Sequence, residues 1–519
     1  MKLELRGITK RFPGVVANQG VNLIVQPGQV HGLLGENGAG KTTLMNVLYG
    51  LYQSEEGEIL LDGKPVRFGG PGDAIEAGIG MVHQHFMLVP VFTVTENVML
   101  GVESTRGPWL QLDRAKARDR IRQISQDHNL HVDPDAYVED LPVGVRQRVE
   151  IIKTLYRQSR VLILDEPTAV LTPQETDELF EIMRSLVAGG TSIIFITHKL
   201  NEVLEVCDQI TVLRRGRVAG TVLPQESDKE QLAELMVGRP VQLVVDKEDA
   251  APREPVLEVR SLTVRDDRGH IAVDNLDLTV HAGEIVAVAG VQGNGQSELA
   301  EVVTGLREIE SGEVLIGGQP VGPNPRAVYR AGVAHVPEDR LEEGLVPGFN
   351  IAENMALNNY WLPPFARGLR LDREVMVARS EERVREFDVR TPSVFNSVAN
   401  LSGGNQQKVI VAREFSRELK LLVAVQPTRG LDVGSIEYIH RRIVQKRDEG
   451  TAVLIISTEL DEVVALGDRI AVMYKGRVVG ILTPEEATFA RLGLLMGGAH
   501  PEEGKPEEAA AAGAGSTGS

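Results

Sequence analysis

The chain has 519 residues, a length that suits two domains better than one hydrophobic core. Its 73 acidic and 55 basic side chains give a net charge of −18, which argues against a protein whose main task is to bind nucleic acid. The single cysteine, Cys207, excludes an internal disulfide framework and a thiolate metal cage, and suits a reducing compartment. The first residues, MKLELRGITKRF, alternate like a strand and lack the apolar core of a signal peptide, and no apolar run approaches the ~20 residues that cross a bilayer. Any membrane role is therefore expected to act through a partner.

A phosphate-binding loop is the first element with a chemical signature. The sequence GENGAGKTT, residues 35–43, follows an apolar run and precedes the helical pattern LMNVLYGL, and such loops require this strand-loop-helix order. Its glycines allow backbone N–H groups to converge on phosphate oxygens at a helix N-terminus, while Lys41 reaches the terminal phosphates and the Thr42 hydroxyl can hold Mg2+. The predicted nucleotide-binding residues of the loop are Gly35, Glu36, Asn37, Gly38, Ala39, Gly40, Lys41, Thr42 and Thr43.

A helical insert and a pair of acidic residues follow. Residues from about His85 to Arg157 are predicted to be mostly helical, because segments such as LDRAKARDRIRQISQ repeat with a helical period. The apolar strand VLIL then leads into Asp165 and Glu166, at the carboxyl edge where parallel sheets hold their ligands. Asp165 is expected to complete the Mg2+ shell, and Glu166 to orient or deprotonate the attacking water. Two adjacent acids are commonly only a solvated turn, but a strand end in a chain with a phosphate loop favours catalysis.

The sequence contains the same domain twice. LELRGITKRF at Leu3 is echoed by LEVRSLTVRD at Leu257, and DEPTAVL at Asp165 by VQPTRGL at Val425. A spacing of roughly 255 to 260 residues over nearly the whole chain indicates a duplicated domain rather than a solenoid. In each copy, Val/Ile/Leu-rich runs alternate with helical patterns, which predicts an α/β domain with a largely parallel sheet, flanking helices and a helical insert. The predicted boundaries are 1–240 for the first domain, 241–255 for a charged exposed linker, 256–498 for the second domain and 499–519 for a disordered tail.

Together these motifs resemble the ABC ATPases, and the resemblance covers almost all of both halves. It implies two tandem nucleotide-binding domains, each with a P-loop NTPase sheet and a helical insert, that bind ATP with Mg2+ and hydrolyse it. It matches Gln84 to the glutamine that links Mg2+ and water to the permease contact, His198 to the histidine that touches the terminal phosphate, and Phe12 to the aromatic that stacks on adenine. Without the resemblance, an isolated histidine or phenylalanine near a strand is more often structural. The predicted catalytic residues are Lys41, Gln84, Glu166 and His198, and the predicted Mg2+ ligands are Thr42, Gln84 and Asp165.

The second half carries the family signature, LSGGNQQK from Leu401, which in ABC ATPases closes over the nucleotide of the opposite half. The resemblance implies that Ser402, Gly403 and Gly404 present donors to the terminal phosphate. Asn405 stands where the family usually has glutamine. Taken alone, a serine before two glycines is an ordinary turn into a helix.

The reactive side chains of the second half are replaced one after another. Gln296 stands for Lys41, Glu338 for Gln84, Val425 for Asp165, Gln426 for Glu166, Glu459 for His198 and Asp266 for Phe12. In the first half the signature has become LPVGVRQ, with Pro142 and Val143 at the serine and glycine positions, and Thr172 replaces the aspartate that Asp432 retains. If the halves pair head to tail, every intact element belongs to one composite site and every altered element to the other. We therefore predict head-to-tail pairing within the chain and one hydrolysis-competent site.

Tandem cassettes with this asymmetry resemble the monosaccharide and nucleoside importers, in which one such chain serves two integral-membrane permease subunits and, indirectly, an external solute-binding protein. The segment VHQHFMLVPVFTVTENVMLG and the sequence VRQRVEI are more similar to the nucleoside branch. The expected location is peripheral, at the cytoplasmic face of the cell membrane. Two alternatives stay open: an importer of another small solute, and a tandem-cassette translation factor without a permease. A nucleotide-binding scaffold without hydrolysis is disfavoured by the complete first site. Translation factors of this kind usually carry two competent sites and a long basic linker, and cassette DNA-repair proteins need zinc modules that one cysteine cannot build.

Overall fold

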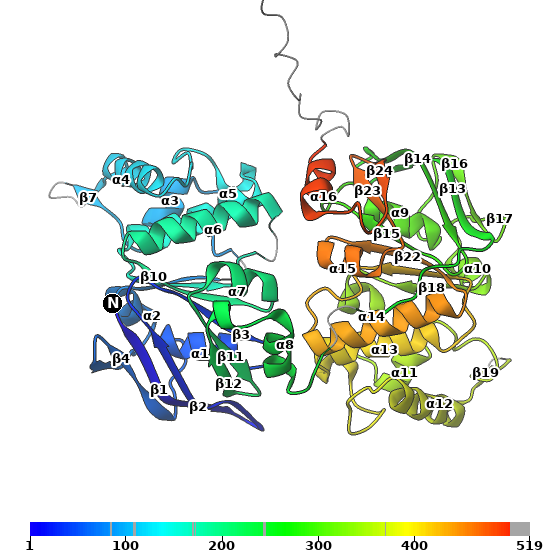
Figure 1. Ribbon diagram of the computed structural model, residues 1–519, viewed down its shortest axis with the longest axis horizontal. Helices are drawn as coiled ribbons and strands as arrows, with labels where there is room; N and C mark the ends of the chain where they lie inside the picture. Colours follow the sequence, from blue (N-terminus) through cyan, green and yellow to red (C-terminus); the bar gives the residue numbers. More distant parts are fainter. Residues whose placement is uncertain are drawn as a thin grey trace, which may run out of the picture. The chain divides into compact units, whose positions relative to one another are not determined.

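The computed structural model describes residues 1–83, 86–106, 111–168, 171, 173–241, 245–368 and 370–498. The predicted site residue Gln84 and the predicted tail 499–519 lie outside these residues. The chain divides into two compact units, the first built from Met1–Leu243 and the second from the residues that follow, apart from the short segment Leu431–Gly434. In Figure 1 the first unit runs in colour from blue to green and the second from green to red.

The main sheet of the first unit has six strands in the order β12-β11-β3-β10-β9-β6, all parallel except β12. Its central strands are apolar runs such as VLILD and SIIFIT in which every residue is buried, as expected for a parallel sheet that is covered on both faces. On β3, Leu33 packs into the core on one face and the next residue, Leu34, into the core on the other. The strands are β3 (Val30–Gly35), β6 (Ile79–Val82), β9 (Val161–Asp165), β10 (Ser192–Thr197), β11 (Gln209–Arg214) and β12 (Arg217–Val222).

A second, antiparallel sheet covers one face of this unit in the order β2-β1-β4-β5. The sequence pattern predicts only a largely parallel sheet, so this antiparallel layer is not predicted. Its strands alternate in polarity, and Leu3, Leu5 and Ile8 of β1 enter the core that also contains Leu33 and Leu44. The strands are β1 (Leu3–Phe12), β2 (Val15–Val25), β4 (Glu56–Leu61) and β5 (Lys64–Val66).

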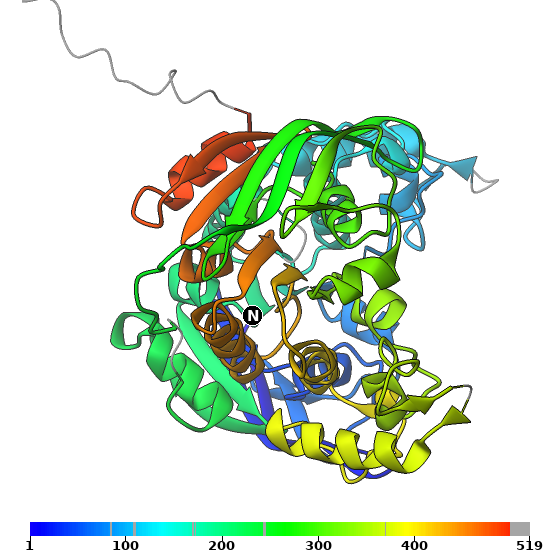
Figure 2. The ribbon, with the colours of Figure 1, turned by 90° about the vertical axis from the view of Figure 1, so that its right-hand side faces the viewer.

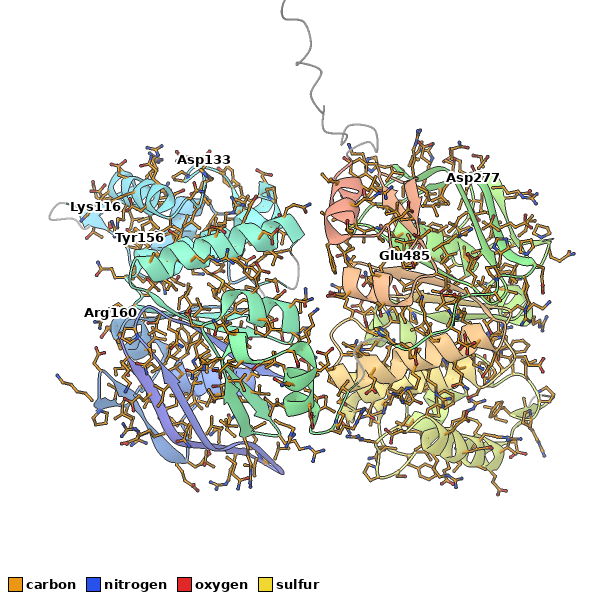
Figure 3. All side chains as sticks on the ribbon, viewed as in Figure 1. Lys116, Asp133, Tyr156, Arg160, Asp277 and Glu485 are labelled. Carbon is orange, nitrogen blue, oxygen red and sulfur yellow. The ribbon has the colours of Figure 1, made fainter. Side chains whose placement is uncertain are left out.

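The helices of the first unit fall into two groups. Five belong to the sheet layers: α1 (Lys41–Leu48), α2 (Pro71–Glu76), α6 (Pro173–Ala188), α7 (Leu200–Val206) and α8 (Lys229–Val237). The others form the helical insert, with a two-stranded ribbon: α3 (Val94–Met99), α4 (Arg114–Asp127), α5 (Val143–Tyr156), β7 (Thr105–Arg106) and β8 (Gln111–Leu112). These insert helices lie within the residues 85–157 that the sequence pattern predicts to be mostly helical. Lys116 and Asp133 lie on the insert surface in Figure 3.

The second unit repeats this architecture. Its sheets have the orders β18-β21-β22-β15-β23-β24 and β14-β13-β16-β17. The strands are β13 (Pro255–Arg265), β14 (Ile271–His281), β15 (Ile285–Ala289), β16 (Ser311–Ile316), β17 (Gln319–Pro320), β18 (Val333–Val336), β21 (Leu421–Val425), β22 (Ala452–Ser457), β23 (Arg469–Tyr474) and β24 (Arg477–Leu482). The sheet-layer helices are α9 (Gln296–Val303), α10 (Pro325–Arg330), α14 (Val433–Asp448), α15 (Leu460–Leu466) and α16 (Phe489–Met496). The insert contains η3 (Arg340–Gly344), α11 (Ile351–Met355), β19 (Ala366–Arg367), β20 (Arg370–Leu371), α12 (Arg373–Glu386) and α13 (Gly403–Phe415).

In Figure 2 the second unit shows its green antiparallel strands at one end and yellow α12 at the other. The duplicated sequence therefore folds into two copies of the same layered domain. Among the described residues, none of the helices has both the length and the apolar character that a membrane span requires.

The predicted linker, 241–255, lacks regular structure over its described residues up to β13, but it is anchored to the second unit. Lys247 Nζ donates hydrogen bonds to the backbone oxygens of Leu466 and Gly467, both at 2.8 Å, and lies 2.9 Å from Asp468 Oδ1. A cation at the carboxyl end of α15 is favoured by the exposed carbonyl groups of the helix terminus. This part of the linker is therefore attached to the second unit rather than extended in solvent.

Candidate functional site

The phosphate loop of the first unit connects β3 to α1. Gly40, the residue before α1, has a φ of 100°, and a Cβ at this position would lie 2.4 Å from the backbone oxygen of Ala17. Only glycine satisfies both the left-handed backbone and this close approach. No side chain caps the N-terminus of α1, so the backbone N–H groups of its first turn are available to phosphate oxygens.

Lys41 is folded over the loop. Its Nζ donates hydrogen bonds to the backbone oxygens of Gly35 at 2.7 Å and Glu36 at 3.2 Å, and the side chain is buried. Burial lowers the pKa of Lys41, while the nearby carboxylates of Glu166 and Asp165 oppose that shift. The ammonium group thus bonds carbonyl oxygens that a bound phosphate can replace.

Asp165 ends β9 with a side chain that is only 6% exposed. Burial, reinforced by the charge of Glu166 and opposed by Lys41, raises the pKa of Asp165 to about 6. A nearby cation would stabilise the ionised form of this buried carboxylate. A carboxylate and a threonine hydroxyl, together with phosphate oxygens and water, are oxygen donors of the kind that Mg2+ binds. Asp165 and the exposed Thr42 therefore fit the predicted metal.

The predicted catalytic residues Glu166 and His198 contact each other in this unit. Glu166 Oε1 lies 3.2 Å from His198 Nδ1, and the Glu166 backbone, with a φ of 48°, donates its N–H to Ile196 O at 2.9 Å. Burial alone would raise the pKa of Glu166, but the hydrogen bond and charge of His198, with the charges of Lys41 and Lys199, outweigh it and the net shift is downward. Glu166 is therefore an ionised, oriented carboxylate that can accept a proton from water.

Phe12 lies at the end of β1, with 38% of its surface exposed. Its ring packs edge to face against Tyr52, with the ring centroids 5.4 Å apart, and Lys10 Nζ lies 5.4 Å from the ring. Tyr52 is a second exposed aromatic next to the predicted adenine position, and no sequence motif marks it. The structure brings Lys41, Asp165, Glu166 and His198 together at the sheet edge, whereas Phe12 belongs to the antiparallel layer.

The signature segment belongs to the second unit, where Ser402 precedes the 13-residue helix α13. Ser402 makes no capping hydrogen bond to the helix, and its Oγ instead accepts one from Asn405 Nδ2 at 2.9 Å. The first N–H groups of α13, beginning at Gly403 and Gly404, therefore lack a side-chain cap. Asn405, where the family usually has glutamine, supports the serine hydroxyl in this structure.

The second unit keeps the backbone of the reactive site but not its chemistry. Gln426 has a φ of 47°, close to that of its counterpart Glu166, but its amide bonds Thr458 Oγ1 at 3.1 Å. Gln296, in the position of Lys41, accepts from Asn294 N–H at 3.0 Å and donates to Val291 O at 3.1 Å. Neutral amides that bond within the unit thus replace the lysine and the general base.

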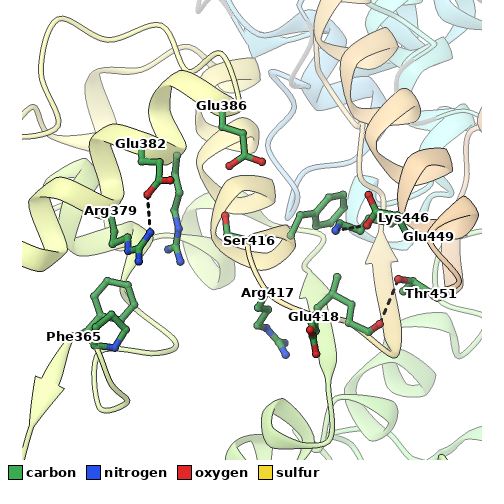
Figure 4. Close-up of a pocket in the computed structure, with 14 residues that line it drawn as sticks. Phe365, Arg379, Glu382, Glu386, Ser416, Arg417, Glu418, Lys446, Glu449 and Thr451 are labelled. Carbon is green, nitrogen blue, oxygen red and sulfur yellow. Dashed lines mark hydrogen bonds and ion pairs between the residues drawn. The ribbon is translucent and has the colours of Figure 1, made fainter.

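The space left at this second position is small. A cavity of about 20 Å3, room for one water molecule, is bounded by Gln296, Glu338 and Gln426. A larger cavity, about 860 Å3, lies elsewhere in the second unit, between the insert and α14 (Figure 4). Its charged residues include the ion pairs Arg379–Glu382 and Lys446–Glu449, and it contains no predicted site residue. Cavity size therefore does not mark the reactive site in this protein.

Comparisons with known proteins agree with this reading of the fold. The ABC transporter family model matches residues 18–169 and 273–429, together more than half of the chain. The chain is 50% identical over 502 residues to the nucleoside import ATP-binding protein NupA of Lactococcus lactis subsp. cremoris, covering 96% of this chain and 99% of that protein. It is 48% identical over 526 residues to the glucose import ATP-binding protein TsgD13 of Haloferax volcanii, covering 96% of each.

Among solved structures, an archaeal ribosome recycling factor in complex with a ribosomal stalk protein aligns over 95% of this chain and 92% of its own, with a TM-score of 0.63 and 18% identity. That likeness shows the fold alone. The predicted α/β fold with two tandem cassettes is thereby confirmed. The chain belongs to the ABC transporter family and is one of its ATP-binding, ATP-hydrolysing chains.

Proposed function

We propose that this chain hydrolyses ATP at one composite site and thereby drives a permease that imports nucleosides or simple sugars. The observation that carries the proposal is the contrast between the two units. The first combines Lys41, Asp165 and the Glu166–His198 pair at one sheet edge, whereas the second places bonded glutamine amides at the corresponding positions.

The first unit binds the phosphates of ATP. Backbone N–H groups of the loop and of the first turn of α1 surround the phosphate oxygens, and Lys41 exchanges its two carbonyl partners for the terminal phosphates. Thr42 and Asp165, with Gln84 as a further predicted ligand, would hold Mg2+, which when bound would supply positive charge to the phosphates. Phe12, with its neighbour Tyr52, stacks on the adenine.

Glu166 then orients a water molecule toward the terminal phosphorus. As the water oxygen forms its bond to phosphorus, the bond to the bridging oxygen breaks, ADP leaves with that electron pair, and the proton of the water passes to Glu166. His198 holds the carboxylate in place and reaches the terminal phosphate from β10. A positioned general base typically contributes about 100- to 10,000-fold in rate.

The signature segment of the second unit completes this site in the proposal. With the halves paired head to tail, Ser402, Gly403 and Gly404 present the hydroxyl and the uncapped N–H groups of α13 to the terminal phosphate. The support is the segregation of the substitutions, because Pro142 and Val143 occupy the signature positions of the half whose phosphate loop is intact. Random loss would have scattered the substitutions over both composite sites.

Permease docking is proposed at the loop that precedes the first insert helix of each unit. In the first unit this loop exposes Met87 (63%) and Val91 (62%). Buried Asn97 bonds both the N–H of Val89 at 2.7 Å and its oxygen at 3.0 Å, so the loop is held in one shape. Exposed apolar side chains on a fixed loop are a typical feature of a protein interface.

In the second unit an asparagine holds the corresponding loop in the same way. Asn354 bonds the N–H of Val346 at 2.8 Å and its oxygen at 3.1 Å, and Phe349 of this loop is 43% exposed. A cavity of about 360 Å3 in this unit is bounded partly by Leu306, Tyr360 and other exposed or half-exposed apolar residues. One docking loop in each unit supports the proposal of two permease subunits and of a peripheral position at the cytoplasmic face of the membrane.

The solute class is inferred from relatives whose names specify nucleoside and glucose import and whose identity to this chain is 48–50%. The similarity to a ribosome recycling factor, at 18% identity, supports only the fold, so the translation-factor alternative is not favoured. Within the proposed complex, the permease and an external solute-binding protein select the solute.

The test uses the chain co-expressed and purified with its permease subunits, measuring ATP hydrolysis and uptake of a labelled nucleoside into proteoliposomes. Glu166→Gln should lower both by roughly 100- to 10,000-fold. The matched variant Gln426→Ala, at the same backbone position of the second unit, should retain hydrolysis within about twofold. Equal losses in the two variants would contradict the asymmetric site, and hydrolysis without nucleoside or sugar uptake would contradict the solute assignment.

A further inference from the structure

The second unit contains a polar network at the place where an active cassette holds metal and phosphate. Glu338 Oε1 accepts a hydrogen bond from Arg429 Nη1 at 2.6 Å and lies 3.4 Å from Gln292 Nε2. Gln292 belongs to the vestigial phosphate loop, Glu338 follows β18, and Arg429 follows β21. Three segments that a nucleotide and its metal would link are therefore linked by protein side chains. Glu338 is 22% exposed and Arg429 is 46% exposed, so the ion pair is accessible to solvent.

The network continues to the signature helix through Arg340. Arg340 Nη1 donates to the backbone oxygen of Arg429 at 2.6 Å. Its Nη2 lies so close to the first residue of α13 that a Cβ on Gly403 would be 3.2 Å away. Arg340 begins η3, whose turn is fixed by Asp339 accepting the N–H groups of Leu341 and Glu342. The guanidinium thus connects the segment after β21 to the start of the signature helix.

Arg340 interacts electrostatically with the neighbouring Asp339 carboxylate rather than through a direct ion pair. No carboxylate of the described chain forms an ion pair with it, and the adjacent Arg429 side chain is also a cation. It lies beside the N-terminal end of α13, where the uncapped N–H groups carry partial positive charge. Asp339 attracts both Arg340 and Arg429, and Glu338 pairs with Arg429, so two carboxylates offset the two guanidinium groups beside the signature helix.

The corresponding positions of the first half contain a different set of residues. Where the second half has Gln292, Glu338, Arg340, Gly403 and Arg429, the first half has Asn37, Gln84, Phe86, Val143 and Ala169. Arg340 and Gly403 of the second half correspond to Phe86 and Val143 of the first half. The first half has neither the carboxylate of Glu338 nor the guanidinium of Arg429 at the corresponding positions. The network therefore belongs only to the half that carries the intact signature.

We propose that Glu338, Arg429 and Arg340 are positioning residues for ATP hydrolysis, which hold the signature segment Ser402–Gly404 in its working position without nucleotide or metal in the second unit. This inference rests on the proposed function, because the segment acts on the ATP of the first unit. In this proposal, the Glu338–Arg429 ion pair connects the segments that bound ATP and metal would connect in a competent cassette. The second unit serves as a preformed half-site.

The experiment compares Arg340→Ala and Arg429→Ala in the full chain with its permeases. Each should lower kcat for ATP hydrolysis roughly 10- to 100-fold, the range for losing a charged hydrogen bond. Binding of a fluorescent ATP analogue to the first unit, measured in a Glu166→Gln background, should change less than twofold. Arg379→Ala, an exposed arginine of the same unit outside the network, serves as the matched control and should keep wild-type kcat.

A charge exchange separates positioning from folding. Glu338→Arg should lower kcat, and adding Arg429→Glu should restore it to within a few-fold, while the melting temperatures of all variants are recorded. If the exchange fails to restore kcat although the double variant melts like the wild type, the ion pair has no positioning role.

Ser402→Ala, tested in parallel, distinguishes this inference from the proposed function. Normal hydrolysis in Ser402→Ala would overturn the head-to-tail site itself. A slow Ser402→Ala beside normal Arg340→Ala and Arg429→Ala variants would leave that site standing and overturn the network.

Discussion

His198 Nδ1 lies 3.2 Å from Glu166 Oε1, and the two residues follow the ends of the neighbouring parallel strands β10 and β9. The pairing fixes the carboxylate at the sheet edge. It also reverses the effect of burial, since the pKa of Glu166 is lowered although burial alone would raise it. The imidazole therefore keeps the proposed general base, Glu166, ionised as well as oriented.

Removing the imidazole should move the acid limb of the pH–rate profile. In His198→Ala, burial is no longer opposed by the strongest partner, so the pKa of Glu166 rises and a higher pH is needed to ionise the base. The measurement is kcat between pH 4.5 and 8.5 at saturating ATP and Mg2+, where the limb should shift to higher pH in addition to a lower plateau. A lower plateau with an unmoved acid limb would mean that His198 acts only on the phosphate.

Asp165→Asn should stabilise the protein in the absence of metal while abolishing hydrolysis. The pKa of Asp165 is raised from 3.8 to about 6 in the folded protein, so the protonated form is favoured by folding. This contribution is fully present below about pH 4 and is lost as the pH rises through about 6. At pH 8 in EDTA, the ionised side chain costs about 3 kcal/mol that asparagine does not.

Thermal unfolding of Asp165→Asn and wild type at pH 8 and pH 4 checks this expectation. The variant should melt higher at pH 8, and the difference should nearly vanish at pH 4, which serves as the internal control. Equal melting temperatures at pH 8 would contradict the raised pKa.

The elements that the sequence predicts are those specified locally. The phosphate loop is set by glycines around Lys41 and by its strand and helix neighbours, and Asp165 is marked by four preceding apolar residues. The two-domain organisation is visible because the repeat brings corresponding motifs into register. The helical insert is visible because its period is close to that of an ideal helix.

The features that the sequence does not predict depend on contacts between distant residues. Glu338 and Arg429 are 91 positions apart, and no local pattern indicates that a residue replacing a metal-linking glutamine forms an ion pair. The attachment of Lys247 to the end of α15 spans 219 residues or more, so composition alone predicts only a charged linker. The antiparallel layer is missed because its alternating strands are less distinct than the buried runs.

Acid destabilisation should depend on His31. This side chain is 1% exposed, its Nε2 lies 2.9 Å from Thr211 Oγ1, and burial lowers its pKa from 6.5 to about 4. The neutral form is therefore favoured by folding, and stability is lost as the pH falls from about 6.5 to 4, by up to about 3 kcal/mol. In His31→Gln the free energy of unfolding, measured by urea titration, should fall less steeply over this window. An unchanged slope would show that other groups cause the loss of stability at low pH.

Restoring the second pocket alone should not restore hydrolysis there. The test begins in Glu166→Gln, where the first site is inactive, and adds the reactive residues of the first half: Gln296→Lys, Glu338→Gln, Val425→Asp, Gln426→Glu and Glu459→His. The backbone at position 426 already has the geometry of its counterpart, with φ values of 47° and 48°, so the new carboxylate is expected to be placed correctly. The composite site would still face Pro142, which offers neither a hydroxyl nor an N–H group to phosphate.

Release of labelled phosphate should therefore stay at the Glu166→Gln background in this chain. It should rise only when Pro142→Ser and Val143→Gly are added, because hydrolysis then has donors on both sides of the terminal phosphate. Pro142→Ser and Val143→Gly without the pocket substitutions provide the control and should give no rise. Recovery with the pocket substitutions alone would mean that each unit hydrolyses ATP without the opposite signature, and the segregation of intact and altered motifs would then need another cause.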